Sequence, residues 1–253
     1  MKKPIIGIIP DYKIGCEGTY SKSPFYAIRA NYLESINKAG GVGIILNYSY
    51  EAIDDYLNLI DGLLFIGGGF DVNPKRYNEE IHPKVTLNEA RDNFEFEMFL
   101  RCIKQKPTMP ILGICNGMQL INIVFGGNCI QHIPDHKQYM NHEQSKNPEF
   151  LDASKTYHQV EILEGTKLFV IAKNKSGNES FNSKVNTNSS HHQAVEKLGK
   201  EIVASAKASD GIIEAIEHET HPFCLGVQWH PEYGSADIDD KIFQAFIKSS
   251  KAN

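Results

Sequence analysis

A cysteine between two glycines could act as a nucleophile in this chain. Residues 111–117 form an apolar run that ends in Gly113-x-Cys115-x-Gly117, and residues 118–124 can continue as a helix. A strand, a tight turn and a helix with a nucleophile at the turn form a nucleophile elbow, in which the glycines avoid collisions with nearby backbone. The start of the helix would favour a thiolate at Cys115. A buried structural cysteine after a core strand is the alternative.

A histidine and a glutamate near the end of the chain could complete a catalytic triad. Residues 224–229 suggest a strand that ends at Trp229, and His230-Pro231-Glu232 follows it. Because side chains alternate in extended backbone, His230 and Glu232 should point to the same face. Glu232 could then orient the imidazole toward Cys115, as a nucleophile and its base require. A surface histidine beside a solvated glutamate is the alternative, but the two motifs together favour catalysis.

Three consecutive glycines, Gly67-Gly68-Gly69, follow a predicted buried strand at 63–66. Backbone without side chains lets N–H groups approach an oxyanion closely. A flexible turn would explain the same residues. The glycines therefore indicate a candidate oxyanion hole only in combination with the cysteine motif.

The motifs around Cys115 and His230 resemble the signatures of class I glutamine amidotransferases. Other parts of the chain resemble one branch, the peptidase C26 family, and within it the γ-glutamyl-γ-aminobutyrate hydrolases. The resembling segments are 4–8, 61–74, 91–95, 188–193 and 210–215, and together with the two motifs they span residues 4–232 in family order. In the hydrolases the residue after the nucleophile is Arg, whereas here it is Asn116, so the resemblance leaves the substrate open.

The resemblance implies a fold and a set of site residues. The fold would be an α/β, flavodoxin-like three-layer sandwich with a mainly parallel central sheet, in one hydrolase domain over residues 1–253. The catalytic residues would be Cys115, His230 and Glu232, and the oxyanion would be held by backbone N–H groups of Gly68 or Gly69 and of Asn116. Residues expected on the substrate side are Gln119, Arg91, His191, His192 and Gln193. An ion pair of Arg91 with Asp92, and a solvated loop at 191–193, are the alternatives.

Composition and charge narrow the class of protein further. The chain has 253 residues with 26 basic and 31 acidic side chains, a net charge of −5, which gives no case for nucleic acid as a partner. Five scattered cysteines do not suggest a disulfide framework. The apolar run near the start is interrupted by Pro10 and Asp11, unlike a signal peptide, and polar residues in 111–133 argue against a membrane span. We expect a cytoplasmic protein.

Hydrophobic periodicity predicts alternating strands and helices in the first half of the chain, which is typical of a parallel sheet. The second half is richer in strands, and no linker or repeat divides the chain. Strands are expected at 5–9, 42–46, 63–66, 111–114, 157–162, 202–206, 212–217 and 224–229. Helices are expected from Pro24 to Ala39, from a capping box at Thr86-x-x-Glu89 to Lys104, from the cysteine turn to Gly126, and over 238–250. Polar loops are expected at 135–155 and 182–190.

Histidines in the first of these polar loops invite a metal interpretation. His132, His136 and His142, together with His158, have carboxylates nearby. The segment contains no Cys-x-x-Cys or His-Glu-x-x-His motif, and a Cys-His-Glu hydrolase needs no metal. We therefore expect solvated loop histidines, no metal and no cofactor.

The sequence thus predicts a hydrolase of γ-glutamyl amide bonds that forms a γ-glutamyl thioester on Cys115 and releases glutamate. By resemblance, γ-glutamyl-γ-aminobutyrate is the first candidate substrate, which would place the protein in polyamine catabolism. The expected partner is this small molecule, not a membrane or nucleic acid, and homodimer formation stays open. Two alternatives remain: a glutaminase subunit that supplies ammonia to a separate synthetase, and a non-catalytic α/β binding or regulatory domain.

Overall fold

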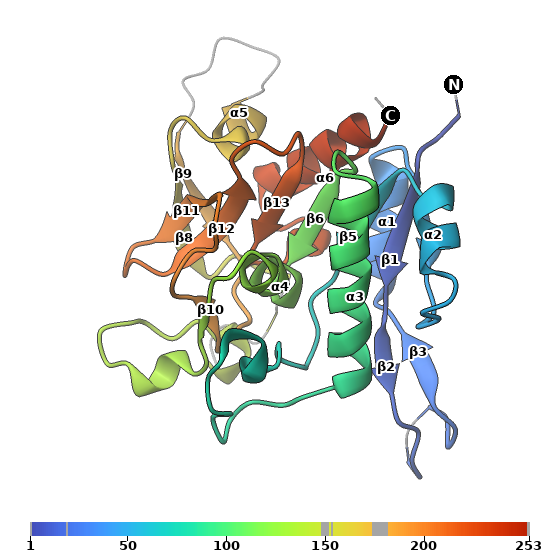
Figure 1. Ribbon diagram of the computed structural model, residues 1–253. Coiled ribbons are helices and arrows are strands. Elements are labelled where there is room, and N and C mark those ends of the chain that lie inside the picture. The colour runs from blue at the N-terminus through green and yellow to red at the C-terminus, as the bar shows by residue number, and fades with distance from the viewer. Residues whose placement is uncertain (1, 19, 148–151, 153, 174–181, 252–253) are drawn as a thin grey trace.

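The computed structural model describes residues 2–18, 20–147, 152, 154–173 and 182–251, and its centre is one twisted sheet (Figure 1). Half of this sheet consists of parallel neighbours, in the order β4 (Val42–Ile45), β1 (Ile5–Ile9), β5 (Gly62–Phe65), β6 (Ile111–Ile114) and β13 (Cys224–Val227). The sheet continues antiparallel through β12 (Ile213–His218), β11 (Ile202–Ala208), β8 (His158–Ile162) and β9 (Lys184–Thr187). Short strands β7 (Cys129–Ile130) and β10 (Ala194–Val195) branch from β12.

Helices cover both faces of the sheet. One face packs against α1 (Ala30–Lys38), α5 (Lys167–Lys173) and α6 (Asp237–Ser250), around buried Trp229 and Phe243. The other face packs against α2 (Ile53–Leu59), α3 (Glu89–Gln105) and α4 (Asn116–Val124), around Phe65 and Phe99. Parallel strands buried on both faces explain why these strands read as apolar runs. The predicted α/β three-layer sandwich is therefore confirmed.

The first predicted helix begins later than its apolar spacing indicated. Residues 25–27 form β3 (Phe25–Ala27), which pairs with β2 (Asp11–Lys13) in a separate two-stranded sheet, and α1 begins only at Ala30. The prediction was wrong because tertiary contacts decide this segment: the Tyr26 ring packs against the rings of Tyr12 and Tyr48 at centroid distances of 5.5 and 5.0 Å.

Two other boundaries also differ from the sequence prediction. The N-cap of α3 is Asn88, whose side chain accepts a hydrogen bond from the Arg91 N–H, so the predicted capping box at Thr86 was wrong. The predicted polar loop at 182–190 contains β9, which pairs with β8. Among the described residues, no helix combines the length and apolar composition that crossing a bilayer requires.

Candidate active site

Cys115 occupies a strained turn between β6 and α4. Its backbone has φ 53° and ψ −106°, outside the regions that residues other than glycine usually adopt. A Cβ at Gly113 would lie 2.5 Å from the Gly117 carbonyl oxygen, and a Cβ at Gly117 would lie 2.3 Å from the Phe65 carbonyl oxygen. Both flanking glycines are therefore required by close backbone approach, and the turn has the geometry of a nucleophile elbow.

His230 and Glu232 meet beside Cys115 because β13 is the parallel neighbour of β6. The His230 Nδ1 and Glu232 Oε1 atoms are 2.7 Å apart. Strand alternation was the wrong reason to expect this contact, since β13 ends at Val227 and residues Pro231–Tyr233 form a 3₁₀ turn that brings the carboxylate round. Asn188 fixes the backbone of His230 by accepting from its N–H and donating to its carbonyl, both at 2.8 Å.

The surroundings of His230 favour its charged form. Burial opposes a charge on the ring, but Glu232 and Cys115, through charge and hydrogen bonds, outweigh burial and hold the pKa of His230 well above its ordinary value. Cys115 and His230 are 7% and 5% exposed, so this pair is shielded from bulk water. The arrangement therefore suits a thiolate–imidazolium pair.

The glycine segment that follows β5, Gly67-Gly68-Gly69, lies against Cys115 and His230. A Cβ at Gly67 would lie 2.7 Å from His230 Cε1 and 3.3 Å from Cys115 Cβ, so only glycine fits there. Gly68 and Gly69 line a pocket of about 180 Å³ together with Cys115 and Asn116. The Asn116 side chain donates to the Phe70 carbonyl at 2.9 Å and so ties the elbow to the glycine segment. The residues predicted to supply the oxyanion donors thus lie together in one pocket.

Arg91 lies under the glycine segment and is not a solvent-facing substrate ligand. Its guanidinium pairs with Glu95 at 2.9 Å and with Asp11, and it donates to the Ile66 carbonyl at 2.5 Å and to the Gly67 carbonyl at 3.3 Å. The residue is 2% exposed. A buried guanidinium must find acceptors for its N–H groups, and here the carbonyls of Ile66 and Gly67 supply two. The expectation of substrate contact, and the alternative of a surface ion pair with Asp92, both disagree with this placement, and we assign Arg91 a positioning role.

A network of glutamine side chains connects the nucleophile to the pocket wall. Gln228 Nε2 lies 3.5 Å from the Cys115 sulfur, and Gln228 Oε1 accepts from Gln119 at 3.1 Å. Gln119 also donates to the Gln193 carbonyl at 3.4 Å. Gln228 was not among the site residues predicted from the sequence. Its position two residues before His230, on the same face of an extended segment, was the available signal.

The segment 191–193, for which a solvated loop was the alternative interpretation, forms part of the pocket wall, and His191 and Gln193 in it are buried. Gln119, His191, His192 and Gln193 all line the pocket beside Cys115, so four of the five predicted substrate-side residues are there. His192 Nε2 lies 3.1 Å from Asp71 Oδ1, and Asp71 lines the same pocket. Its carboxylate raises the pKa of His192 from the ordinary value, against the opposing effect of burial. The pocket therefore offers both donors and acceptors for a polar ligand.

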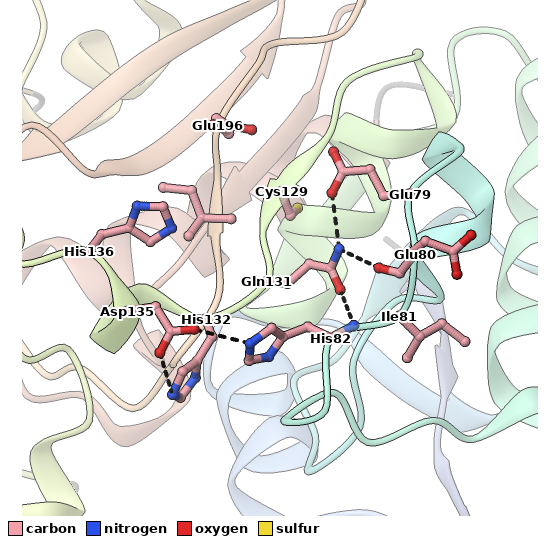
Figure 2. Close-up of a pocket in the computed structure, with 11 residues that line it drawn as sticks. Glu79, Glu80, Ile81, His82, Cys129, Gln131, His132, Asp135, His136 and Glu196 are labelled. Atoms are coloured by element: carbon pink, nitrogen blue, oxygen red, sulfur yellow. Dashed lines mark hydrogen bonds and ion pairs between the residues drawn. The ribbon is translucent and has the colours of Figure 1, made fainter.

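The four histidines considered as metal ligands separate into two places. Figure 2 shows His132 and His136 at a different pocket, of about 410 Å³, where the His132 ring stacks on His82 at 5.4 Å between centroids. His82 Nε2 pairs with Asp135 Oδ2 at 3.0 Å. His142 and His158 are buried elsewhere, at 1% and 8% exposed, so the expectation of solvated loop histidines was wrong for these two.

Comparisons with known proteins place the chain in a family. The model of the peptidase C26 family matches residues 4–232. The glutamine amidotransferase-like protein RP404 of Rickettsia prowazekii is 38% identical over 99% of each chain, and the γ-glutamyl-γ-aminobutyrate hydrolase PuuD of Escherichia coli K12 is 27% identical over 98% of this chain and 93% of its own. A crystal structure of a GMP synthase-like protein from Thermoplasma acidophilum matches all of this chain and 96% of its own, with a TM-score of 0.62 at 17% identity, which shows the shared fold. The chain belongs to the peptidase C26 family.

Proposed function

We propose that this protein hydrolyses γ-glutamyl amides through a covalent intermediate on Cys115. The observation that carries the proposal is that Cys115 lines a pocket with polar groups and interacts with His230, whose Nδ1 atom lies 2.7 Å from Glu232 Oε1. A strained cysteine, a base and an orienting carboxylate are the parts that nucleophilic acyl transfer needs. The similarity to PuuD, a γ-glutamyl-γ-aminobutyrate hydrolase, supports the choice of substrate class.

The first half of the reaction transfers the γ-glutamyl group to the enzyme. The Cys115 thiolate attacks the γ-carbonyl carbon, a C–S bond forms, and the carbonyl electrons move to oxygen. Backbone N–H groups of Gly68 or Gly69 and of Asn116 hold that oxyanion, and each such donor contributes roughly a factor of 10²–10³ in rate. The C–N bond then breaks as His230 gives its proton to the leaving amine, which leaves a γ-glutamyl thioester.

The second half releases glutamate. His230, now neutral, takes a proton from water as the water oxygen attacks the thioester carbonyl. The C–S bond breaks, glutamate leaves, and the thiolate–imidazolium pair is restored. Glu232 holds the ring through Nδ1 in both halves, so that the other ring nitrogen stays directed at the reacting atoms.

The polar wall of the pocket would recognise the glutamyl part of the substrate. Asp71 supplies a carboxylate that could face an α-amino group, and Gln119 and His192 supply nitrogen donors or acceptors nearby. Asn116, held by its bond to the Phe70 carbonyl, adds no positive charge beside the nucleophile. γ-Glutamyl-γ-aminobutyrate, an intermediate of polyamine catabolism, is the first candidate, and other γ-glutamyl amides follow.

A substrate panel tests this function. We expect the purified chain alone, without ATP or a partner protein, to release glutamate and amine from γ-glutamyl-γ-aminobutyrate or another γ-glutamyl amide faster than from glutamine. A preference for a different γ-glutamyl amide would keep the reaction and change the leaving group. Activity on glutamine alone, and only after a partner protein is added, would contradict the proposal and favour an ammonia-supplying glutaminase. Two relatives carry the names glutamine amidotransferase-like protein and glutamine amidotransferase.

The pH dependence provides a further prediction. Because the pKa of His230 is raised, its protonated form should persist above about pH 6.5, the ordinary imidazole value, and the alkaline limb of kcat/KM should lie well above that pH. Glu232→Gln removes the larger of the two charge effects that raise this pKa, so the alkaline limb should move to lower pH. Rates measured between about pH 5 and 10 on both proteins check this shift. An unchanged alkaline limb in Glu232→Gln would remove Glu232 from the proposed charge network.

A further inference from the structure

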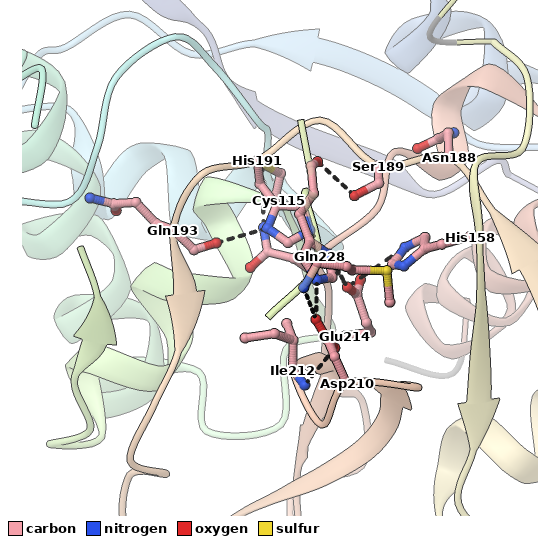
Figure 3. Close-up of polar contacts among 12 residues, drawn as sticks. Cys115, His158, Asn188, Ser189, His191, Gln193, Asp210, Ile212, Glu214 and Gln228 are labelled. Carbon is pink, nitrogen blue, oxygen red and sulfur yellow. Dashed lines mark hydrogen bonds and ion pairs between the residues drawn. The ribbon is translucent and has the colours of Figure 1, made fainter. Parts of the chain in front are cut away.

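A fully buried carboxylate surrounded by imidazole rings lies in the interior beside the candidate active site. Glu214, on β12, is 0% exposed, and neither of its side-chain oxygens has a hydrogen-bond partner among the described residues. Three imidazole nitrogens surround its Oε1 atom instead: His142 Nδ1 at 3.2 Å, His191 Nε2 at 3.5 Å and His158 Nε2 at 3.7 Å. Figure 3 shows Glu214 with His158 and His191, and with Gln228 and Cys115 in the same region. A buried, unsatisfied carboxylate is costly and calls for an explanation.

Two of the imidazole rings, those of His142 and His191, also have an acceptor on the side away from Glu214. These acceptors determine which ring nitrogen carries the proton and which one directs a lone pair at the Glu214 carboxylate. His191 Nδ1 lies 2.8 Å from the Gln193 carbonyl oxygen, which can only accept, so Nδ1 carries the proton. His142 Nε2 lies 3.0 Å from Asp210 Oδ2, which assigns the proton to Nε2 in the same way. In their neutral forms both rings therefore direct a lone pair toward Glu214. Such an arrangement is repulsive unless each ring gains a second proton or a cation lies among them.

The geometry suits a cation. The ligand atoms of His142, His158 and Glu214 all lie within 4.8 Å of one another. In a tetrahedral Zn²⁺ site with metal–ligand bonds of about 2.0–2.1 Å, neighbouring ligand atoms are about 3.3–3.4 Å apart. Three of the six ligand–ligand separations of such a site, those from Glu214 Oε1 to the three imidazole nitrogens, are 3.2, 3.5 and 3.7 Å and so are close to this value. Neutral imidazole nitrogens with one carboxylate oxygen are a donor set that zinc accepts.

We propose that His142, His158, His191 and Glu214 bind one zinc ion. Asp210 and the Gln193 carbonyl act as the outer partners that fix the ring orientations of His142 and His191, a common arrangement around metal-bound histidines. Four protein ligands leave no open position for substrate or water, so the ion has a structural role. This inference is independent of the proposed hydrolase activity.

The ion would join segments that are distant in sequence and that surround the pocket. His142 comes from the loop after β7, His158 from β8, His191 from the pocket wall and Glu214 from β12. The Glu214 carbonyl also accepts from the Gln228 N–H at 2.7 Å, and Gln228 contacts the Cys115 sulfur. Zinc binding would therefore hold the pocket wall against the strands that carry the active-site residues.

Zinc content and cobalt substitution of the wild-type chain test the proposal directly. We expect the protein, purified without chelator, to contain about one zinc ion per chain by elemental analysis. After removal of zinc with a chelator, added Co²⁺ should give the intense visible absorption bands of tetrahedral cobalt, and added zinc should abolish them. Zinc at about 100 times its Kd should raise the melting temperature by roughly 5–10 °C.

Single substitutions then locate the ion. Glu214→Gln and His158→Gln should weaken zinc binding by at least about 100-fold, and Asp210→Asn, which changes only an outer partner, by about 10–100-fold. His136→Ala, which removes an exposed histidine of the same loop, is the matched control and should bind zinc like the wild type. Circular dichroism would show which variants are folded.

Two results would overturn the proposal. One is a folded wild-type chain that contains no zinc, gives no cobalt bands and shows no change in melting temperature with zinc. The cluster would then be held by the ion pair of His142 with Glu214 and not by a metal. The other is a wild-type zinc content that is retained by both Glu214→Gln and His158→Gln, which would place the ion elsewhere.

Discussion

Replacing Cys115 by alanine is expected to lower kcat/KM for γ-glutamyl amides by at least about 10³-fold, because no other side chain at the elbow can form the thioester. Alanine keeps the Cβ that the strained turn already accommodates, at φ 53°, and loses only the sulfur. The variant should therefore keep the melting temperature of the wild type within a few degrees. Steady-state kinetics and thermal unfolding of the two proteins check both expectations.

Cys16 provides the matched control for this substitution. It is exposed, in contrast to the buried Cys102, Cys115, Cys129 and Cys224, and it does not line the pocket at Cys115. Cys16→Ala should keep wild-type kcat and KM. A Cys115→Ala protein that is folded and retains more than about a tenth of the activity would show that another group is the nucleophile.

Replacing His230 by alanine is expected to have a comparable effect, again on the order of 10³-fold or more in kcat/KM. His230 carries out proton transfer in both halves of the proposed reaction, and its ring also interacts with the Cys115 sulfur. Glu232→Gln should cost less, because glutamine keeps much of the shape and the ring stays close to the sulfur, although the preferred tautomer can change. The expected order of kcat is therefore wild type, then Glu232→Gln, then His230→Ala.

A second substitution at His230 separates a catalytic role of the ring from a structural one. His230 packs against Gly67 and Cys115, so loss of the ring could also loosen the glycine segment. His230→Gln fills part of the same space without acting as a base, and it should be as inactive as His230→Ala while melting closer to the wild type. Recovery of activity in His230→Gln would indicate that the ring acts through packing.

The sequence predicted the parts of the site that local backbone geometry determines. Gly113 and Gly117 flank Cys115 because the elbow leaves no room for a Cβ, and this constraint is visible in consecutive residues. The parallel half of the sheet was predictable because its strands are short apolar runs that alternate with helical patterns. The meeting of His230 and Glu232 was expected for the wrong reason, since a 3₁₀ turn and not an extended strand joins them.

The rest depends on contacts between distant segments. Arg91 looks like half of an exposed helix ion pair in the sequence, and only the fold shows that the carbonyls of Ile66 and Gly67 meet its guanidinium. Residues 25–27 have helical spacing, but pairing with residues 11–13 makes them a strand. The convergence of His142, His158 and His191 on Glu214 requires the order of the antiparallel strands, which no local pattern indicates.

Direct detection of the acyl-enzyme tests the central claim, that Cys115 carries the γ-glutamyl group. Wild-type protein would be mixed with the best substrate of the panel, quenched in acid within the first turnovers, and analysed by intact-protein mass spectrometry and peptide mapping. We predict a mass increase of one γ-glutamyl group on the peptide that contains Cys115, and none in Cys115→Ala. The absence of any adduct during rapid turnover, also under conditions where thioester hydrolysis is slowed, or an adduct on a different residue, would contradict the account.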